Sequence, residues 1–312
     1  MRRLIVLPAV FFLFYGCMPK VAFVSEQTGK TQIHLMNING SSVQQLSNGR
    51  MVDRTPDTSP DGEEIVCSSL YNGKRNLFSM KISNGQVRQI TTGTHPKYWP
   101  RWDSTKTKIA YSENVDSTWK IFTIKPGTTI APVQITAPPA GQEDSGGHDF
   151  FNSGRQIVFS RYAQIQDIHR LYTKSAEAGG RPTLVPNQTY NPIKPCISHD
   201  GKLLAYVSRF PQLGNSRIDK IIVHKVGSWD VVAEITLKTP VKIWKPGVAG
   251  LAFSHDDKRV YVAAHSNDVS ATGNKDLEIF AITLDEMEQT RLTNNQVADY
   301  SPSAVPSKLW PF

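Results

Sequence analysis

The sequence predicts an all-β protein, a six-bladed β-propeller of four-stranded blades. The main observation is a short apolar run, usually ending in Ser, that recurs six times along the 312 residues. The runs are Lys20–Ser25, Glu64–Ser68, Lys108–Ser112, Gln156–Ser160, Leu204–Ser208 and Arg259–Ala263. Equivalent residues in successive runs are 44, 44, 48, 47 and 56 positions apart. Strand-containing repeats of this length are the signature of propeller blades.

Each repeat divides into four short strands separated by turns. The first strand, called here the channel strand, ends in a turn such as Ser59-Pro60-Asp61-Gly62. Asp-Gly between apolar runs is typical of a hairpin, because Gly accepts a positive φ and Asp hydrogen-bonds its own backbone. The recurring apolar run is the second strand. A third strand with alternating apolar residues and an outer strand ending in apolar-Thr, as in Gln89-Ile90-Thr91, complete the blade.

The two ends of the repeat region complement each other. The region starts near residue 20 with a second strand, and residues 299–306 form a channel strand with nothing after it. We therefore expect three N-terminal strands and one C-terminal strand to share the first blade, which closes the ring and hides both sheet edges. This predicts a single propeller domain over residues 18–312.

The first 17 residues have the pattern of a targeting signal. Met1-Arg2-Arg3 is basic, residues 4–15 are almost entirely apolar, and Gly16 and Cys17 follow. The apolar stretch is too short to span a bilayer and has the proportions of a signal peptide. It resembles a bacterial lipoprotein signal, although Phe14 and Tyr15 depart from the usual pattern. We expect lipidation of Cys17 and attachment in the cell envelope, facing the periplasm or at the outer membrane. A cleaved secretory signal, giving a secreted or soluble periplasmic protein, and a cytosolic protein are the alternatives.

Charge and cysteine content exclude several classes of protein. The formal charge of +8 is spread along the chain, and no Lys/Arg run is interleaved with aromatics, so we expect no nucleic-acid partner. Cys67 and Cys196 fall in blades on different sides of the channel, beyond the reach of a disulfide. Both are predicted to be small buried hydrophobes, and not a redox pair or a metal site.

The repeat resembles that of TolB-type propellers, which are six-bladed propellers of the bacterial envelope. The resemblance is carried by Ser59-Pro60-Asp61-Gly62, Ile65-Val66-Cys67-Ser68 and Gln89-Ile90-Thr91, and it covers roughly residues 20–308. TolB itself has an additional N-terminal α/β domain, which we expect to be absent here, and it has no lipid anchor. The resemblance implies a lipid-anchored relative that shares the propeller. TolB-type propellers bind a peptidoglycan-associated lipoprotein, so it also implies a protein partner.

Signatures of catalysis are missing from the sequence. There is no Gly-x-Ser-x-Gly elbow and no His-Glu-x-x-His, and Gly29-Lys30-Thr31 lies in a turn between strands without the first Gly of a phosphate loop. His199-Asp200 and His255-Asp256 are interpreted as turn-forming pairs at the opposite end of the channel strands. We therefore expect no enzymatic activity, no cofactor and no metal.

The best candidate for a binding site is the channel mouth at which the channel strands begin. Trp, Tyr and Arg, the residue types that dominate binding hot spots, are frequent there. The predicted binding residues are Asp53, Arg54, Trp99, Arg101, His148, Asp149, Tyr190, Asn191, Lys245, Asp299 and Tyr300. The structural alternative is that aromatics before Pro plug the channel or pack between blades. Long loops over residues 209–219, 238–250 and 265–276 would build up one side of this mouth.

Three functions are consistent with the sequence. The leading hypothesis is a non-enzymatic, lipid-anchored and monomeric scaffold that binds an envelope protein or peptide at the mouth. The second is a glycan-binding protein or polysaccharide lyase or hydrolase, which clustering of Asp53, Arg101, His148 and Asp149 would favour. The third is a structural component of a larger envelope complex that uses the outer blade surfaces.

Overall fold

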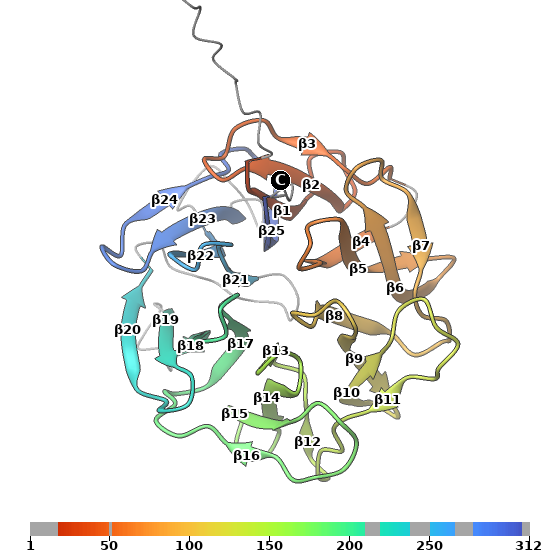
Figure 1. The fold of residues 1–312 in the computed structure, drawn as a ribbon, viewed down its shortest axis with the longest axis vertical. Helices are drawn as coiled ribbons and strands as arrows, with labels where there is room; N and C mark the ends of the chain where they lie inside the picture. The colour runs from red at the N-terminus through yellow and green to blue at the C-terminus, as the bar shows by residue number, and fades with distance from the viewer. Residues whose placement is uncertain (1–17, 50–51, 210–218, 238–249, 266–276, 308–312) are drawn as a thin grey trace, which may run out of the picture.

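The computed structural model describes residues 18–49, 52–209, 219–237, 250–265 and 277–307. All regular structure in these residues is β, arranged as six sheets around a central axis (Figure 1). No helix in them is long and apolar enough to cross a membrane. The predicted six-bladed β-propeller is confirmed.

Each blade follows the predicted order from the channel outwards. The channel strands are β25 (Asp299–Val305), β4 (Val52–Thr58), β8 (Lys97–Trp102), β13 (His148–Phe151), β17 (Pro192–Ile197) and β21 (Leu251–Phe253). The second strands are β1 (Lys20–Ser25), β5 (Glu64–Tyr71), β9 (Ile109–Val115), β14 (Gln156–Ala163), β18 (Leu203–Arg209) and β22 (Arg259–His265). The third strands are β2 (Gln32–Asn37), β6 (Lys74–Lys81), β10 (Thr118–Ile124), β15 (Ile168–Ser175), β19 (Asp219–Lys225) and β23 (Leu277–Thr283). The outer strands are β3 (Gln44–Gln45), β7 (Val87–Gln89), β11 (Val133–Gln134), β16 (Thr183–Leu184), β20 (Val231–Thr236) and β24 (Gln289–Arg291).

The first blade closes the ring in the way that the sequence predicts. Its strand order is β25-β1-β2-β3, so one C-terminal strand joins three N-terminal ones. β25 runs antiparallel to β1, with Val21 opposite Ala304 and Ser25 opposite Asp299, and Figure 1 shows the two strands side by side. The inner edge of β1 is therefore paired and not left open to another chain.

Blade 4 differs from the predicted four-stranded pattern by one short strand. β12 (Gln142–Glu143) pairs with Tyr162 and Ala163 at the end of β14, beyond the reach of β13. The reason is that β13 is short, starting only at His148 after two glycines, so the end of the long strand β14 needs another partner.

The hydrophobic core is divided into clusters between neighbouring blades. Alternate residues of a second strand serve different clusters: Leu204 and Tyr206 pack toward blade 4, whereas Ala205 and Val207 pack toward blade 6. Because side chains alternate between the two faces of a strand, a sheet covered by a blade on each side needs apolar residues at every position. This explains why the repeated runs are continuously apolar.

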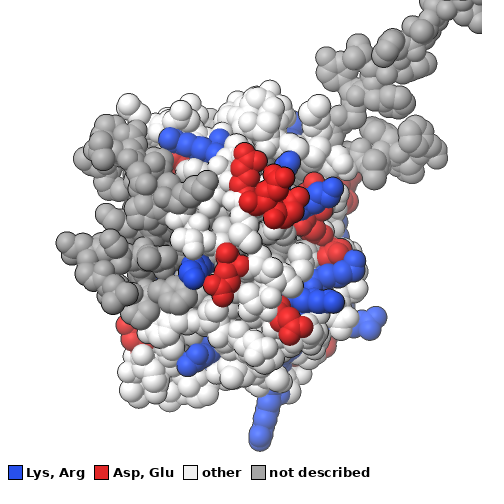
Figure 2. Space-filling model, turned by 90° about the vertical axis from the view of Figure 1, so that its left-hand side faces the viewer, with Lys and Arg blue, Asp and Glu red and all other residues white. Residues whose placement is uncertain are grey.

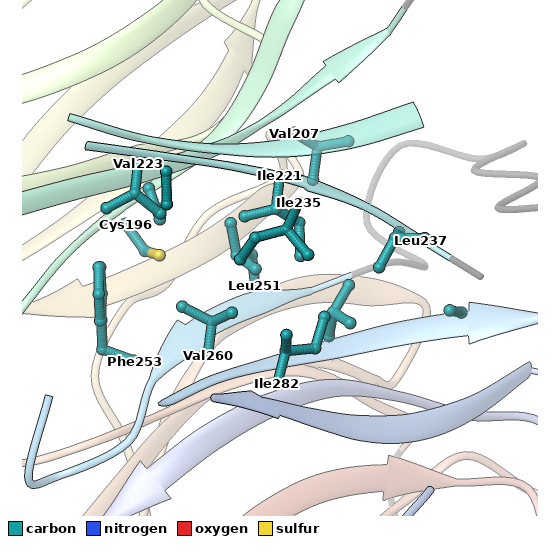
Figure 3. Packing of buried hydrophobic residues seen from close by; sticks show 14 of the residues in the cluster. Cys196, Val207, Ile221, Val223, Ile235, Leu237, Leu251, Phe253, Val260 and Ile282 are labelled. Carbon is teal, nitrogen blue, oxygen red and sulfur yellow. The ribbon is translucent and has the colours of Figure 1, made fainter. Parts of the chain in front are cut away.

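The junction of blades 5 and 6 shows this packing from close by. Val207, Ile221 and Ile235 of blade 5 meet Leu251 and Ile282 of blade 6 (Figure 3). The prediction that Cys67 and Cys196 are buried and not bonded to each other is also confirmed, here and at the junction of blades 1 and 2. Cys196 and Cys67 are buried and free, in different clusters, and burial raises the pKa of both thiols well above the ordinary value.

Two polar residues of the repeat have structural roles. The Ser that ends the apolar run of a second strand reaches the next channel strand: Ser68 Oγ donates to the carbonyl of Lys97 at 2.6 Å, and Ser160 Oγ to that of Pro192 at 2.7 Å. The Thr after an outer strand accepts the backbone N–H of the third strand, as Thr91 does from Leu77 at 2.9 Å. The repeated Ser and Thr thus stabilise contacts between blades and within them.

The outer surface carries mixed charge. Figure 2 shows one side of the ring, on which Lys and Arg side chains lie among Asp and Glu side chains. Ion pairs such as Lys220–Glu234, 3.2 Å between Nζ and Oε2, connect neighbouring strands. Among the described residues on this side of the ring, positive and negative side chains are therefore mixed, and the net positive charge does not form a patch.

Ile221→Ala is expected to lower the free energy of unfolding by about 2–5 kcal/mol, because Ile221 is fully buried between blades 5 and 6. The control is Val232→Ala in the same blade, where the side chain is 53% exposed and the expected change is below about 0.5 kcal/mol. Urea denaturation followed by circular dichroism measures both. Equal effects of the two substitutions would contradict this description of the core.

Candidate functional site

The channel has two chemically different mouths. The channel strands begin at the front mouth, which also carries the hairpins between second and third strands, such as Tyr71–Lys74 between β5 and β6. They end at the back mouth, in turns such as the one closed by a hydrogen bond from Gly62 N–H to the carbonyl of Ser59. A channel strand advances about 3.3 Å per residue, so its first and last side chains lie at opposite mouths.

Four channel strands share a bulge at an X-Pro step. The pairing with the second strand shifts there, and the residue before Pro has a positive φ of 49–54°. The four steps are Thr55-Pro56, Trp99-Pro100, Lys194-Pro195 and Ser301-Pro302. Pro has no N–H to offer the ladder, and a non-glycine residue at positive φ is unfavourable, so the bulges are strained positions. All four residues before Pro line the channel.

The channel is almost closed at this level. The four residues and Gly250 surround a cavity of about 30 Å³, which holds no more than one or two waters. Trp99 is only 8% exposed, and the Lys194 ammonium lies 4.5 Å from the centre of its indole, a cation–π contact. Trp99 therefore fills the channel. This agrees with the alternative given above, in which an aromatic residue before Pro plugs the channel.

Glycines allow neighbouring channel strands to approach each other closely. A Cβ on Gly147, which has a φ of +101°, would lie 3.3 Å from Lys194 Cα, and one on Gly250 would lie 2.6 Å from Ser301 Cα. Blades 4 and 6 therefore place glycine where blades 3 and 5 place Trp99 and Lys194.

Aromatic and arginine side chains gather at the front mouth over blades 2 and 3. The Tyr98 and Trp119 rings are 5.6 Å apart, and each contacts the Trp99 ring at 5.5–5.6 Å. The Arg75 guanidinium lies 5.0 Å from the centre of the Tyr98 ring. Tyr98 and Trp119 are half-buried, so one part of each ring supports Trp99 and the rest remains open to solvent.

Three predicted residues at the front mouth are buried. Asp53 accepts a hydrogen bond from Ser69 Oγ at 2.5 Å, and Asp299 accepts one from Asn295 Nδ2 at 2.7 Å. Burial raises the pKa of both carboxyls, that of Asp299 to about 6. Tyr300 is 2% exposed within the core between blades 1 and 6.

The remaining front-mouth predictions lie nearer to solvent or outside the described residues. Arg54 is half-buried on the channel strand of blade 2, Tyr190 is 41% exposed, and Asn191 is half-buried with its Oδ1 accepting the backbone N–H of His169. Lys245 lies outside the described residues, as do most of the three long loops.

Arg101 and Asp149 lie on the back-mouth side of the constriction, because each comes two residues after the channel-lining position held by Trp99 in blade 3 and Gly147 in blade 4. They line a cavity of about 300 Å³ together with Asp57 and His199. Arg101 Nη1 is 3.0 Å from Asp57 Oδ1. Burial raises the pKa of Asp149 to about 6, Arg101 opposes this shift, and the Asp57 charge adds to it.

The back-mouth side chains also connect neighbouring blades. Asp57 Oδ2 accepts the backbone N–H of Trp102 at 2.7 Å, and Asp149 Oδ2 accepts that of Ile197 at 2.8 Å. At the equivalent position in blade 1, Ser303 Oγ accepts the N–H of Thr58 at 3.0 Å. In each case a channel strand supplies the acceptor and the next channel strand supplies the donor. We call these three bonds the blade latches.

The four residues whose clustering would favour a glycan site or an enzyme do not converge. Arg101 and Asp149 share the back-mouth cavity, whereas Asp53 lies at the front mouth. His148 is buried, with Nδ1 3.4 Å from Ser112 Oγ, and burial lowers its pKa to about 3. Within the part of the chain that the structure describes, no group of three His, Cys, Asp or Glu residues could hold a metal ion.

Two residues with prominent places in the channel were not predicted from the sequence. Lys194 lies beside Trp99 in the constriction, and Asp57 forms a latch and an ion pair with Arg101. The recurring X-Pro step in the channel strands was the signal for Lys194, because it aligns Lys194-Pro195 with Trp99-Pro100.

Asp149→Asn is expected to change how stability depends on pH. A folded-state pKa of about 6, above the ordinary value of 3.8, means that Asp149 supports folding below pH 4 and loses this contribution as the pH rises to about 6. Relative to the native protein, the variant should therefore gain up to about 3 kcal/mol between pH 4 and 7. Urea denaturation at several pH values measures this difference.

Asp200→Asn is the matched control. The pKa of Asp200 is lowered to about 2, with hydrogen bonds from Lys202 N–H and Ser198 Oγ opposing the effect of desolvation. This variant should therefore lose stability relative to the native protein as the pH rises from 2 to 4, the opposite sign. An Asp149→Asn curve parallel to that of the native protein would contradict the assigned environment of Asp149.

Solved structures share the fold of this chain at low sequence identity. TolB from Acinetobacter baumannii superposes with a TM-score of 0.74 at 15% identity, over 93% of this chain and 67% of that one. An oligogalacturonate lyase in complex with manganese superposes with a TM-score of 0.57 at 15% identity, over 87% of this chain and 73% of the lyase. At this level of identity both comparisons concern the fold alone.

Sequence comparison relates the chain to a family. A TolB homologue from Chlorobaculum tepidum is 29% identical over 102 residues, which are 31% of this chain and 23% of that protein. The match thus spans less than a quarter of the relative's length. The family described as the TolB beta propeller domain matches residues 17–179, more than half of the 312 residues. This chain belongs to the TolB β-propeller domain family.

Proposed function

We propose that this protein is a non-enzymatic scaffold of the cell envelope, anchored by a lipid on Cys17, whose propeller binds a protein or peptide partner at the front mouth. In this proposal residues 1–17 are a signal peptide that ends in the lipidated cysteine, and residues 18–312 are one monomeric propeller. Membership of the TolB propeller family supports a protein-binding role in the envelope.

The observation that carries the proposal is the aromatic surface of the front mouth. Tyr98 and Trp119 are half-buried and braced by Trp99, and Arg75 stacks on Tyr98. Rigid aromatic side chains with neighbouring arginines lose little conformational entropy on binding and provide large contact areas, so they suit a protein partner.

The arrangement of ionisable groups favours a scaffold over a glycan-cleaving enzyme. The carboxylates Asp57 and Asp149 accept the hydrogen bonds of blade latches, and Asp57 is also paired with Arg101. Their oxygens are thus engaged in holding neighbouring blades together. The constriction around Trp99 also separates the two mouths, so the groups at one end do not reach a ligand at the other.

Replacing Tyr98 and Trp119 together by Ala is expected to weaken partner capture at least about tenfold, because truncating aromatic hot-spot residues typically costs 2 kcal/mol or more. The measurement is crosslinking in intact envelopes, followed by quantification of the dominant partner. His255→Ala at the back mouth is the control, since His255 is exposed on the other side of the propeller. Thermal melting verifies that both variants fold.

Each outcome separates the candidate functions. Loss of the partner with the front-mouth variant alone supports the proposal. Unchanged capture by both variants would sink it and direct attention to the outer blade surfaces. A partner lost only with His255→Ala would assign binding to the back mouth.

Cys17→Ser is expected to move the protein from the membrane fraction to the soluble fraction, because the serine hydroxyl cannot form the thioether to the lipid. Detergent phase partitioning and the mass of the mature protein measure the change. Met18→Ala is the neighbouring control and should stay with the membrane. If Cys17→Ser also remains in the detergent phase, the lipid anchor is wrong and the protein is held at the membrane in another way.

A further inference from the structure

A pocket of about 390 Å³ opens at the front mouth between blades 4 and 5. Its inner end is formed by Lys194 of β17 and Arg209 at the end of β18. The hairpin between β14 and β15 provides one wall with Tyr162 and His169, whose rings are 4.9 Å apart. The pocket is large enough for two or three amino-acid side chains, and nothing in the proposed aromatic surface accounts for it.

Lys194 is held at the inner end without a hydrogen-bond acceptor. Its Nζ is inaccessible to solvent and has no partner among the described residues, while the indole of Trp99 covers one side of it at 4.5 Å. Arg209 and Arg101 are the charged groups that act most strongly on it, and both are cations. A buried ammonium without a counter-ion is unfavourable, so the site is complementary to an anion.

Two adjacent glycines hold Lys194 in this place. The carbonyl of Gly146 accepts the backbone N–H of Lys194 at 2.7 Å, and a Cβ on Gly147 would press on Lys194 Cα. A Cβ on Gly146 would clash with Ser160 Oγ at 2.2 Å and His169 Nδ1 at 2.7 Å, two atoms that are 3.0 Å apart and hydrogen-bonded to each other. The pocket is therefore preorganised by the backbone of both blades.

The outer rim of the pocket has the opposite charge. Glu143 is half-buried on β12, and Asp167 is exposed on the hairpin between β14 and β15, where its Oδ1 accepts a hydrogen bond from Tyr162 at 2.8 Å. His169 adds no charge, because burial lowers its pKa to about 3. A ligand that enters the pocket thus passes two carboxylates before it reaches two cations.

We propose that this pocket binds a peptide segment that carries one acidic and one basic group. A glutamate, aspartate or C-terminal carboxylate is held by Lys194 and Arg209, and a basic residue nearby is held by Glu143 and Asp167. The inference rests on the proposed function and names the chemistry of the partner segment. Ion pairs at the inner end are shielded from water by Trp99 and the glycine backbone, so they contribute more to affinity than exposed pairs do.

Binding of a carboxylate is linked to the protonation of Lys194. Burial, together with Arg209 and Arg101, lowers the pKa of the Lys194 ammonium to about 7. The ionisable groups around it are Arg101 of β8, His148 of β13, His169 of β15, Arg209 of β18, and Glu143, Tyr162 and Asp167 at the rim. A carboxylate against the ammonium raises its pKa again, so the complex takes up to about half a proton at pH 7.

The test is isothermal titration calorimetry with the full propeller and the peptide acetyl-Gly-Glu-Gly-Lys-Gly-amide. The matched peptide with Gln in place of Glu should bind at least about tenfold more weakly. Lys194→Met should weaken the Glu peptide by a similar factor, because the thioether keeps the packing on Trp99 and removes the charge. The control Lys202→Met removes an exposed lysine at the back of the propeller and should leave the affinity unchanged.

Proton uptake provides a second readout. Titrations at pH 7 in buffers of different ionisation enthalpy should show uptake of a fraction of a proton for the native protein. Lys194→Arg should retain binding of the Glu peptide without this uptake, because the guanidinium stays charged at every relevant pH. A purely structural role of Lys194 would not produce this pattern.

Three results would overturn the inference. These are equal binding of the Glu and Gln peptides, undiminished binding by Lys194→Met, and binding of digalacturonate but not of the peptide, which would assign the pocket to uronate glycans. If any one of these results is obtained while the Tyr98 and Trp119 double variant still loses its envelope partner, the proposed function stands and only the peptide pocket is wrong. If the peptide does not bind as expected and the Tyr98 and Trp119 double variant also keeps its partner, the front mouth is not a docking site.

Discussion

The blade latches are the interaction on which the channel depends. Each one takes an acceptor from one channel strand, Asp57, Asp149 or Ser303, and a backbone N–H from the next channel strand. The latch from Ser303 has a special place, because it joins the C-terminal strand of blade 1 to blade 2, across the point where the ring is closed. Six sheets that meet at a narrow axis leave little room for water, so the backbone groups at the axis need protein partners.

The latches also determine how charge is distributed between the two mouths. The carboxylates of Asp57 and Asp149 are engaged by backbone N–H groups, and Asp57 is also paired with Arg101, so the back mouth is largely neutralised from within. No comparable acceptor meets Lys194 in the constriction. The front mouth therefore combines an aromatic surface over blade 3 with an unsatisfied cation beside blade 5, and these two features underlie the proposed binding role.

Most of the fold could be predicted from the sequence, because each blade repeats the same local requirements. The apolar runs, the Asp-Gly turns and the unpaired ends of the repeat region each follow from strand geometry, and all reappear in the structure. The extra strand β12 was not predicted, since it depends on the length by which β14 exceeds β13. No local pattern in Gln142 and Glu143 indicates such a pairing.

The candidate site was predictable only as a set of positions along the channel strands. Trp99 and Arg101 are two residues apart in the sequence, yet Trp99 fills the constriction and Arg101 pairs with Asp57 at the back mouth. His148 and Asp149 are adjacent, but one is buried against Ser112 and the other joins a latch. Sequence order does not reveal which neighbour from another blade occupies the space around each side chain.

The number of blades, the order of strands and the closure of the ring follow from the sequence pattern alone. These features depend on patterns of polarity and turn residues within some 45 residues, a range over which the backbone imposes its own geometry. The chemistry of the two mouths depends instead on contacts between blades, which form only when the chain is folded. The Lys194 ammonium is buried against Trp99, and glycines of blade 4 allow the close approach of the strand that carries it. Such contacts join residues that are about 50 or more positions apart in the sequence.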